Sequence, residues 1–150
     1  MSSPEAIEST VRKLLASQRL AVLATCEDEG HPYANLMAFA ATEDIKTLLF
    51  VTGRATRKYE NLCAESGVAL LIDNRSHAAS DVHEAAAATV LGDAEEVSGE
   101  ERDRLLRIYL AKHPHLEDFA SSPSCALFRV RVRSYYLVRR FQQVTELHVQ

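Results

Sequence analysis

Apolar residues recur every three or four positions near the start of the chain, which is the spacing of an amphipathic helix. The repeating positions are Ile7, Val11, Leu14 and Leu15. Ser3 and Pro4 stand in front of them, and these residue types favour the N-cap and the first turn of a helix. The pattern therefore predicts an N-terminal helix within residues 1–18.

Two later segments have the same helical spacing. The first covers residues 56–66 and precedes Gly67, which suits a C-terminal stop. The second follows Ser98 and Glu101, which have the spacing of a capping box, and it ends at the pair His113-Pro114. The apolar faces consist of Tyr59, Leu62 and Cys63 in the first segment and of Leu105, Ile108 and Tyr109 in the second. We expect a helix in each segment.

Short apolar runs between turn residues predict most of the strands. These runs cover residues 20–26, 33–41, 47–52, 68–73, 85–97, 135–141 and 144–149. The first three runs are joined by short turns, so we expect a β-hairpin that continues into an antiparallel meander. Residues 74–84 are polar without a clear period and predict an exposed loop.

One further strand has a strict period of two. Phe128, Val130 and Val132 alternate with Arg129, Arg131 and Arg133, which indicates one apolar and one charged face. About seven strands with a few helices predict an α+β fold built on an antiparallel β-barrel. The arginine face is expected to be solvated or to face another subunit.

Composition and charge narrow the class of protein. The chain has 150 residues, of which 47% are hydrophobic and 25% are charged, and this predicts a single domain over residues 1–150 with the barrel in residues 20–149. A net charge of -4 provides no general field for nucleic acid. Charged residues interrupt the first apolar stretch, so we expect neither a signal peptide nor a membrane helix and place the protein in the cytoplasm.

Cysteines and histidines give no strong metal signal. The three cysteines, Cys26, Cys63 and Cys125, are far apart and form no CxxC pair, so we expect buried, reduced thiols. The histidines that could form clusters are His77 and His83, close to Asp81 and Glu84, and the pair His113 and His115. Neither group has a convincing ligand spacing, and we expect no metal site. No catalytic acid–base arrangement is recognisable, so catalytic residues stay unassigned.

The segment FVTGRATRKYENL, residues 50–62, carries the clearest chemical signal. A strand runs through Gly53 into the start of a helix, and three cations, Arg54, Arg57 and Lys58, gather there. Unpaired N–H donors already make a helix start positive, so added cations favour a bound phosphate, to which Thr56 could also donate. The alternative is a solvated surface in which Arg57 pairs with Glu60 and Lys58 with Glu65. No GxxxxGK[ST] or GxGxxG motif is present.

These residues resemble a known family. The strand, the glycine, the triplet Thr56-Arg57-Lys58 and the following helix are similar to the pyridoxamine 5'-phosphate oxidase-like, FMN-binding split barrels. The preceding hairpin, LAVLATCEDEGHPYANLMAFA, resembles the opening of that family, and the order of elements up to Leu147 is also similar. The resemblance implies an antiparallel split β-barrel with peripheral helices, which is a homodimer with FMN between the subunits.

The resemblance also implies particular contacts. Thr56, Arg57 and Lys58 would bind the FMN phosphate, with Arg54 nearby. The ring system would lie beside Asn35, Leu36 and Met37 of one strand and Val51 and Thr52 of the next. An FMN-dependent oxidoreductase acting on a small molecule is the first interpretation. The alternative is a non-catalytic protein that binds flavin, deazaflavin or haem, for which His83 or His148 would be the axial ligand.

Some positions depart from the pattern of true pyridoxamine phosphate oxidases. Asn35 and Ala40 stand where that enzyme has basic residues, and the chain ends in ELHVQ where the enzyme has an Arg-x-His motif. We therefore expect no oxidation of pyridoxamine 5'-phosphate.

Overall fold

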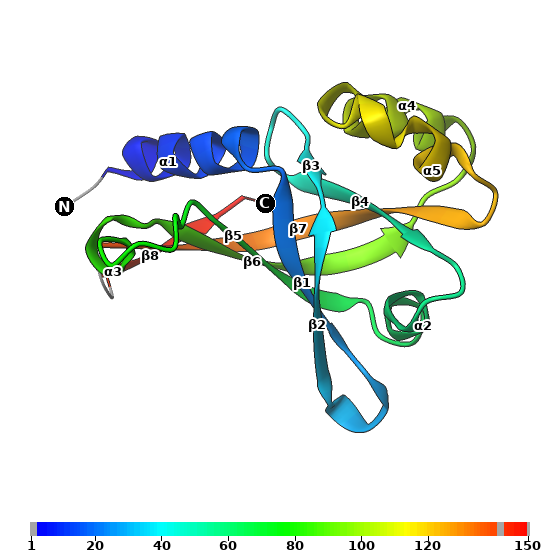
Figure 1. Ribbon diagram of the computed structural model, residues 1–150, viewed down its shortest axis with the longest axis horizontal. Coiled ribbons are helices and arrows are strands. Elements are labelled where there is room, and N and C mark those ends of the chain that lie inside the picture. The colour runs from blue at the N-terminus through cyan, green and yellow to red at the C-terminus, as the bar shows by residue number, and fades with distance from the viewer. Residues whose placement is uncertain (1–2, 141–142, 150) are drawn as a thin grey trace.

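The computed structural model describes residues 3–140 and 143–149, and Phe141, the expected end of one strand, lies outside them. Within this part of the chain, one antiparallel sheet of eight strands curls into a half-open barrel with helices around it (Figure 1). The strands are β1 (Leu20–Cys26), β2 (Pro32–Ala38), β3 (Ala40–Ala41), β4 (Thr47–Gly53), β5 (Gly67–Asp73), β6 (Ala87–Glu96), β7 (Cys125–Arg139) and β8 (Gln143–His148). The helices are α1 (Pro4–Ser17), α2 (Arg57–Ala64), α3 (Asp81–Glu84), α4 (Gly99–Lys112) and α5 (Glu117–Ser121). The predicted α+β barrel is confirmed.

The strand order explains how the sheet closes on itself. Neighbouring strands follow the order β2-β1-β5-β6-β7-β4-β3, and β8 pairs with β7. The two ends of this path, β2 and β3, are separated in the chain by Phe39 alone. One stretch of chain thus pairs first with β1 and then with β4, where Ala40 lies opposite Leu49. The predicted meander is confirmed only in part, because the second segment pairs with β1 along β2 but pairs with β4 only at β3, and β4 otherwise pairs with the distant β7.

Strand β7 forms the centre of the sheet and is longer than predicted. It runs through Ser134 without a break, with β6 on one edge and with β4 and then β8 on the other. Where its register with β6 shifts, a Cβ at Gly92 would clash with the carbonyl oxygen of Arg131, so only glycine fits. The arginines on the charged face of β7 form ion pairs with acidic residues, as Arg129 does with Glu95 at 2.6 Å.

The helix ends match the predictions only in part. Helix α1 begins as expected, and the Ser3 hydroxyl accepts a hydrogen bond from the N–H of Ala6 (3.1 Å). Helix α4 begins at the expected place, but the Ser98 side chain makes no capping bond, so the capping box is wrong. Gly67 does not end a helix, since it is the first residue of β5. The pattern missed α3, which lies in the predicted loop, and α5.

Two apolar clusters hold the fold together. The larger one fills the barrel and includes the inner face of α1, with Val11, Leu23, Phe50, Leu70 and Tyr135 at its centre. The smaller one lies between the other face of β4 and β7 and helices α4 and α5, and it contains Leu49, Leu105, Tyr109 and Leu127. Both faces of β4 are therefore covered, which is why its sequence is apolar throughout.

Two further features that were expected from the sequence concern the burial of the cysteines and the length of the apolar helices. All three cysteines are free, but Cys125 alone is buried, while Cys26 is partly exposed and Cys63 is exposed. The prediction of buried thiols is therefore wrong for two of them. Among the described residues, no helix is both long and apolar enough to cross a membrane.

Candidate functional site

The turn between β4 and α2 is organised by one threonine. The Thr56 hydroxyl donates to the carbonyl of Gly53 (2.8 Å) and accepts from the backbone N–H of Tyr59 (3.1 Å). It also lies 3.1 Å from the hydroxyl of Thr52, which is buried at the end of β4. Thr56 is thus the N-cap of α2, and its bonds fix how the chain leaves the sheet and enters the helix.

Arg54, the first cation of this turn, is bound within the protein. Its guanidinium forms an ion pair with Glu96 of β6 at 2.7 Å and donates to the Tyr59 hydroxyl at 3.1 Å. The Tyr59 hydroxyl in turn donates to Glu96 (3.0 Å). The hydrogen bond from Arg54 holds the pKa of Glu96 below its usual range and raises that of Arg54 itself. Arg54 therefore connects the turn to β6, and its charge is already compensated.

The other two cations of the turn differ from Arg54. The side chain of Arg57 is 61% exposed and has a long contact of 3.4 Å with Glu27, so the expected alternative pairing with Glu60 is not the one observed. Lys58 is partly buried, and burial lowers the pKa of its ammonium group. No acidic group of the described chain pairs with Lys58, and the expected alternative pairing with Glu65 is not formed. Lys58 is therefore a partly desolvated cation without a counter-charge in the first turn of α2.

The β2 strand supplies a second polar feature. Among the described strands, only β1 pairs with it, which leaves its outer edge free, and the strand runs close to β4. The amide oxygen of Asn35 is buried and has no hydrogen-bond partner among the described residues. Leu36 points outward and is 62% exposed, whereas Met37 packs into the barrel core. A buried acceptor without a donor is uncommon in native proteins, and Asn35 therefore marks a position where a ligand could donate.

The side chains of the buried β4 residues Val51 and Thr52 make contacts within the protein. Val51 is part of the smaller apolar cluster, and the Thr52 side chain is used in the turn. Their side chains face away from solvent, so only their backbone groups remain for a ligand at the open edge.

The joint between β2 and β3 is clamped by the end of α4. The carbonyl of Phe39 lies 2.7 Å from Nε2 of the buried His113, and the Lys112 ammonium lies 3.9 Å above the Phe39 ring. The Lys112 ammonium also donates to the carbonyl of Leu15 at 2.8 Å. Burial lowers the pKa of Lys112 to about 8 and lowers that of His113 as well. The strand carrying Asn35 is therefore fixed at its far end by α4.

Several residues of this region could not be identified from the sequence. Glu96 and Tyr59 share Arg54, and buried Asn61 donates to Thr25 of β1 at 3.0 Å, which ties α2 to the hairpin. Only Tyr59 had a local signal, as a member of the apolar face that was predicted for residues 56–66. Glu96 and Thr25 come from distant parts of the chain.

The histidines expected as metal or haem ligands are dispersed. His148 lies 2.9 Å from the carboxylate of Glu146 and 3.2 Å from the hydroxyl of Ser134, and His83 lies in the short helix α3. Asp81 accepts bonds from Ser76 and His77, which makes it a loop-stabilising group. In the part of the chain that the structure describes, no three acidic, histidine or cysteine side chains gather as metal ligands would.

Comparisons with known proteins show the family through one family model and the fold through solved structures. A family model described as pyridoxamine 5'-phosphate oxidase matches residues 7–139. None of the curated proteins matches the sequence. Among solved structures, a haem-binding protein from Mycobacterium smegmatis has a TM-score of 0.85 at 18% identity, over 99% of this chain and 59% of its own. This chain therefore spans somewhat more than half of that protein.

Two further structures have the same fold with different ligands in their descriptions. A FAD-binding protein from Mesorhizobium loti has a TM-score of 0.66 at 20% identity and covers 88% of this chain and 92% of its own. The haem storage protein HutZ from Vibrio cholerae has a TM-score of 0.68 at 15% identity, over 83% of this chain and 89% of its own. At these identities the likeness shows the split-barrel fold alone.

Proposed function

Because the chain belongs to the pyridoxamine 5'-phosphate oxidase family, we propose that it is an FMN-binding protein whose phosphate site is the turn at Thr56, Arg57 and Lys58. The observation that carries this proposal is Lys58, a partly buried ammonium without an acidic partner in the described chain. It lies where the N–H groups of α2 also favour an anion. Arg57 adds a second cation with only a weak partner.

The open edge of β2 fits the polar rim of a flavin ring. The unpartnered amide oxygen of Asn35 accepts hydrogen bonds, and the free backbone edge at Leu36 and Met37 both donates and accepts them. Bound flavin supplies hydride and electron chemistry, while the protein binds and orients it. We propose an oxidoreductase that acts on a small molecule, with no assigned catalytic side chain.

The proposal includes a homodimer in the cytoplasm. Val138 of β7 and Val144 of β8 lie opposite each other on an outer sheet face, and Val144 is 61% exposed. A second copy could cover such apolar side chains, as in obligate homodimers. Three free thiols agree with a reducing compartment.

Titration with FMN tests the phosphate site. We expect the double substitution Arg57→Ala with Lys58→Ala to weaken FMN binding by a factor of at least ~100, since a hydrogen bond to a charged group contributes about 1.5–3 kcal/mol. The matched control is Arg104→Ala with Arg107→Ala on α4, which removes two exposed cations and should leave affinity unchanged. An unchanged dissociation constant in the Arg57/Lys58 variant, with an intact fold by circular dichroism, would refute the assignment.

Haem and deazaflavin are the alternative ligands. Haem is favoured by the shared fold with the Mycobacterium smegmatis and Vibrio cholerae proteins, whose descriptions name haem. The absorption spectrum of the purified protein separates the candidates, because flavin gives two bands in the near-ultraviolet and blue, whereas haem gives one dominant Soret band. A Soret band without flavin bands would replace the FMN proposal.

A further inference from the structure

A cavity of about 280 Å³ lies between helix α1, helix α4 and the turn that joins β3 to β4. Figure 1 shows this turn, residues 42–46, between the two helices. None of the described residues that line the cavity belongs to the proposed FMN site. Its volume lies just below the range of drug-sized sites, which is about 300–1,000 Å³. The cavity therefore suits a small molecule.

Most of the cavity wall is apolar. The apolar residues come from the end of α1, from β3, from the turn and from α4, and they are Leu15, Ala16, Ala40, Ala41, Ile45 and Ile108. Among the polar residues of the wall, the Arg12 guanidinium contacts Glu8 at 3.4 Å, and the Thr42 hydroxyl donates to Asp44 at 2.7 Å. These polar groups are thus already used within the protein.

One part of the wall has a strained backbone. Ile45 has a left-handed conformation (φ 56°), which is a genuine outlier for a β-branched residue, and its side chain is buried. The Tyr135 hydroxyl donates to the Ile45 carbonyl (2.6 Å), and the Ile45 N–H donates to the Thr42 carbonyl (3.0 Å). Such strain persists where neighbouring groups hold it, and it is concentrated at functional sites. The cavity wall is therefore held in one shape.

Lys112, the last residue of α4, also lines the cavity and is partly buried. Its ammonium group donates to the Leu15 carbonyl at 2.8 Å and lies 3.9 Å above the Phe39 ring. No acidic side chain of the described chain forms an ion pair with it. Lys112 is therefore an amine at an apolar cavity without a counter-charge.

The charged surroundings of Lys112 are basic. Arg19 stands just before β1, where its carbonyl accepts from the N–H of Phe39 (3.3 Å), and His113 and His115 follow Lys112 at the end of α4. Burial and then the charge of Arg19 lower the pKa of Lys112 to about 8. Burial also lowers the pKa of His113, and the charges of Lys112, His115 and Arg19 act in the same direction. Lysine amines become nucleophiles when they are desolvated in an apolar pocket beside another cation.

We propose that Lys112 forms an imine with a short apolar aldehyde that binds in this cavity. Nζ bonds to the carbonyl carbon, and the carbonyl oxygen leaves as water together with both hydrogens of the neutral amine, so no oxidant or reductant is needed. The protonated imine keeps one N–H for the Leu15 carbonyl and leaves its charge above the Phe39 ring. The apolar wall favours an alkyl chain. The site does not depend on FMN.

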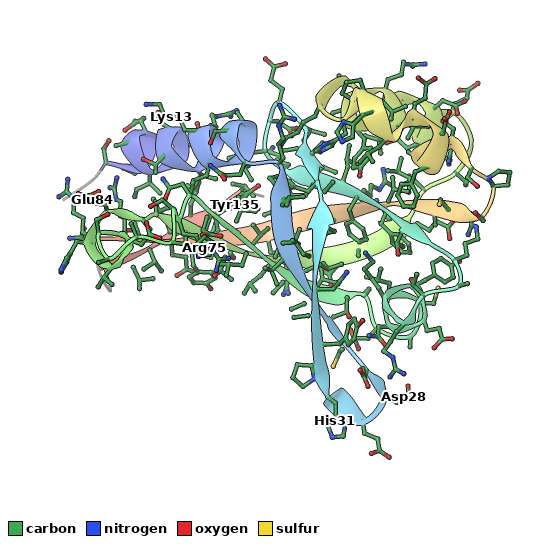
Figure 2. The ribbon with its side chains drawn as sticks, viewed as in Figure 1. Lys13, Asp28, His31, Arg75, Glu84 and Tyr135 are labelled. Atoms are coloured by element: carbon green, nitrogen blue, oxygen red, sulfur yellow. The ribbon has the colours of Figure 1, made fainter. Side chains whose placement is uncertain are left out.

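Reductive trapping tests the proposal on the full chain saturated with FMN. The protein is incubated at about pH 7.5 with butanal and sodium cyanoborohydride, which converts an imine into a stable secondary amine. Peptide mass spectrometry follows all four lysines of the chain, Lys13, Lys46, Lys58 and Lys112. Lys13 and Lys46 are exposed references, and Figure 2 shows Lys13 on the side of α1 away from the sheet. We expect Lys112 to be labelled at least about tenfold faster than both, because solvated lysine amines are almost wholly protonated at this pH.

Variants test the surroundings of the amine. Ile108→Glu places a carboxylate in the wall one helical turn before Lys112 and should slow its labelling about tenfold, because it favours the charged ammonium form. Arg107→Glu places the same side chain on the exposed face of α4 and is the matched control. Arg19→Gln removes a repelling charge and should slow the labelling about threefold. Circular dichroism confirms that each variant is folded.

A matched pair of aldehydes tests the apolar wall. Methoxyacetaldehyde has the length of butanal, with an ether oxygen in place of one methylene group. Labelling of Lys13 in the same sample corrects for the difference in intrinsic reactivity. We expect the ratio of Lys112 to Lys13 labelling to be about threefold higher for butanal, which is roughly the effect of burying one methylene group.

Three results would each overturn the proposal. If Lys112 is labelled no faster than Lys13 and Lys46, it only ties α4 to α1. Equal labelling ratios for the two aldehydes would show that the cavity does not hold the alkyl chain, and an Ile108→Glu variant that is labelled like the parent would exclude this cavity as the site. Labelling of Lys58 in the FMN-saturated protein would instead contradict the proposed phosphate site, so the two failures are distinguishable.

Discussion

At the residue scale, three cations that are close in the sequence differ in what they can bind. Arg54 is neutralised by Glu96 at 2.7 Å, and Arg57 has a long contact with Glu27 at 3.4 Å. Lys58 has no acid in the described chain, and burial lowers the pKa of its ammonium group. A cation contributes to ligand binding mainly when its charge is uncompensated, so Lys58 is expected to dominate the phosphate site.

The lowered pKa of Lys58 predicts a pH dependence of FMN binding. The ammonium form binds phosphate, so affinity should fall as the pH rises through the pKa of free Lys58, which lies below the usual 10.5. Lys58→Arg stays charged over this range and should flatten the decline. Fluorescence titrations of both proteins between about pH 7 and pH 10.5 measure the effect. Parallel curves for the two proteins would contradict it.

The residues of β2 and β3 predict the absence of one activity. Asn35 and Ala40 offer no positive charge where the related oxidase has basic residues, and a phosphorylated substrate needs a cationic clamp of its own. We expect the FMN-loaded protein to show no sustained turnover of pyridoxamine 5'-phosphate with oxygen. Formation of pyridoxal 5'-phosphate, followed by absorbance, checks this expectation, and repeated turnovers would show that other cations replace the missing ones.

At the scale of elements, the helices α1, α2 and α4 each have a serine or threonine at the N-cap position, but the side chain forms a capping hydrogen bond in only α1 and α2. The Ser3 hydroxyl caps α1 and the Thr56 hydroxyl caps α2, whereas Ser98 stands before α4 without a side-chain bond. The far end of α4 is fixed instead by His113, which contacts the Phe39 carbonyl at 2.7 Å. Helix α4 is therefore stabilised by its contacts with the sheet and not by a cap.

This difference between the caps predicts the effect of two alanine substitutions. Ser3→Ala should lower the free energy of unfolding by about 1 kcal/mol, because it leaves an N–H group of α1 without its partner. Ser98→Ala should change it by less than about 0.5 kcal/mol, since no capping bond is lost. Urea unfolding with unchanged slope gives both values. An equal loss in both variants would mean that Ser98 caps α4 in solution.

At the scale of the whole molecule, the sheet closes by passing one strand segment from β1 to β4 at Phe39. This connection leaves the edge of β2 open beside β4. Asn35 belongs to β2, and the turn that carries Arg54, Arg57 and Lys58 joins β4 to α2. Outer sheet faces also remain uncovered, at Val144 and around Leu36. Exposed apolar faces of this kind commonly mark association sites.

The uncovered face at β7 and β8 predicts a homodimer. Light scattering of the FMN-loaded protein should give twice the chain mass of 16.7 kDa. Val144→Glu should shift the mass toward the monomer, because it places a charge in an apolar contact. Lys13→Glu also introduces an acidic side chain, on the exposed face of helix α1, and serves as the control. A monomer in the parent protein would contradict the prediction.

Much of the local structure could be predicted because it depends on near neighbours in the chain. The limits of β1 were predicted correctly as residues 20–26, and the stripe of α1 and the alternation of β7 were also found. The turn after β4 was predicted from Gly53 and the following Thr-Arg-Lys triplet, and its role as a phosphate site stays a prediction. Short helices such as α5 were missed, since five residues are too few for a periodic signal.

The sequence by itself determined the type of most elements and the residues of the basic turn, because periodicity and turn chemistry act between residues a few positions apart. Only the tertiary structure decided which strands are neighbours, that Arg54 is neutralised by Glu96 while Lys58 is not, and that Ile45 and Lys112 share one cavity. These facts depend on contacts between distant segments, and such contacts are chosen by how all the apolar faces are buried together.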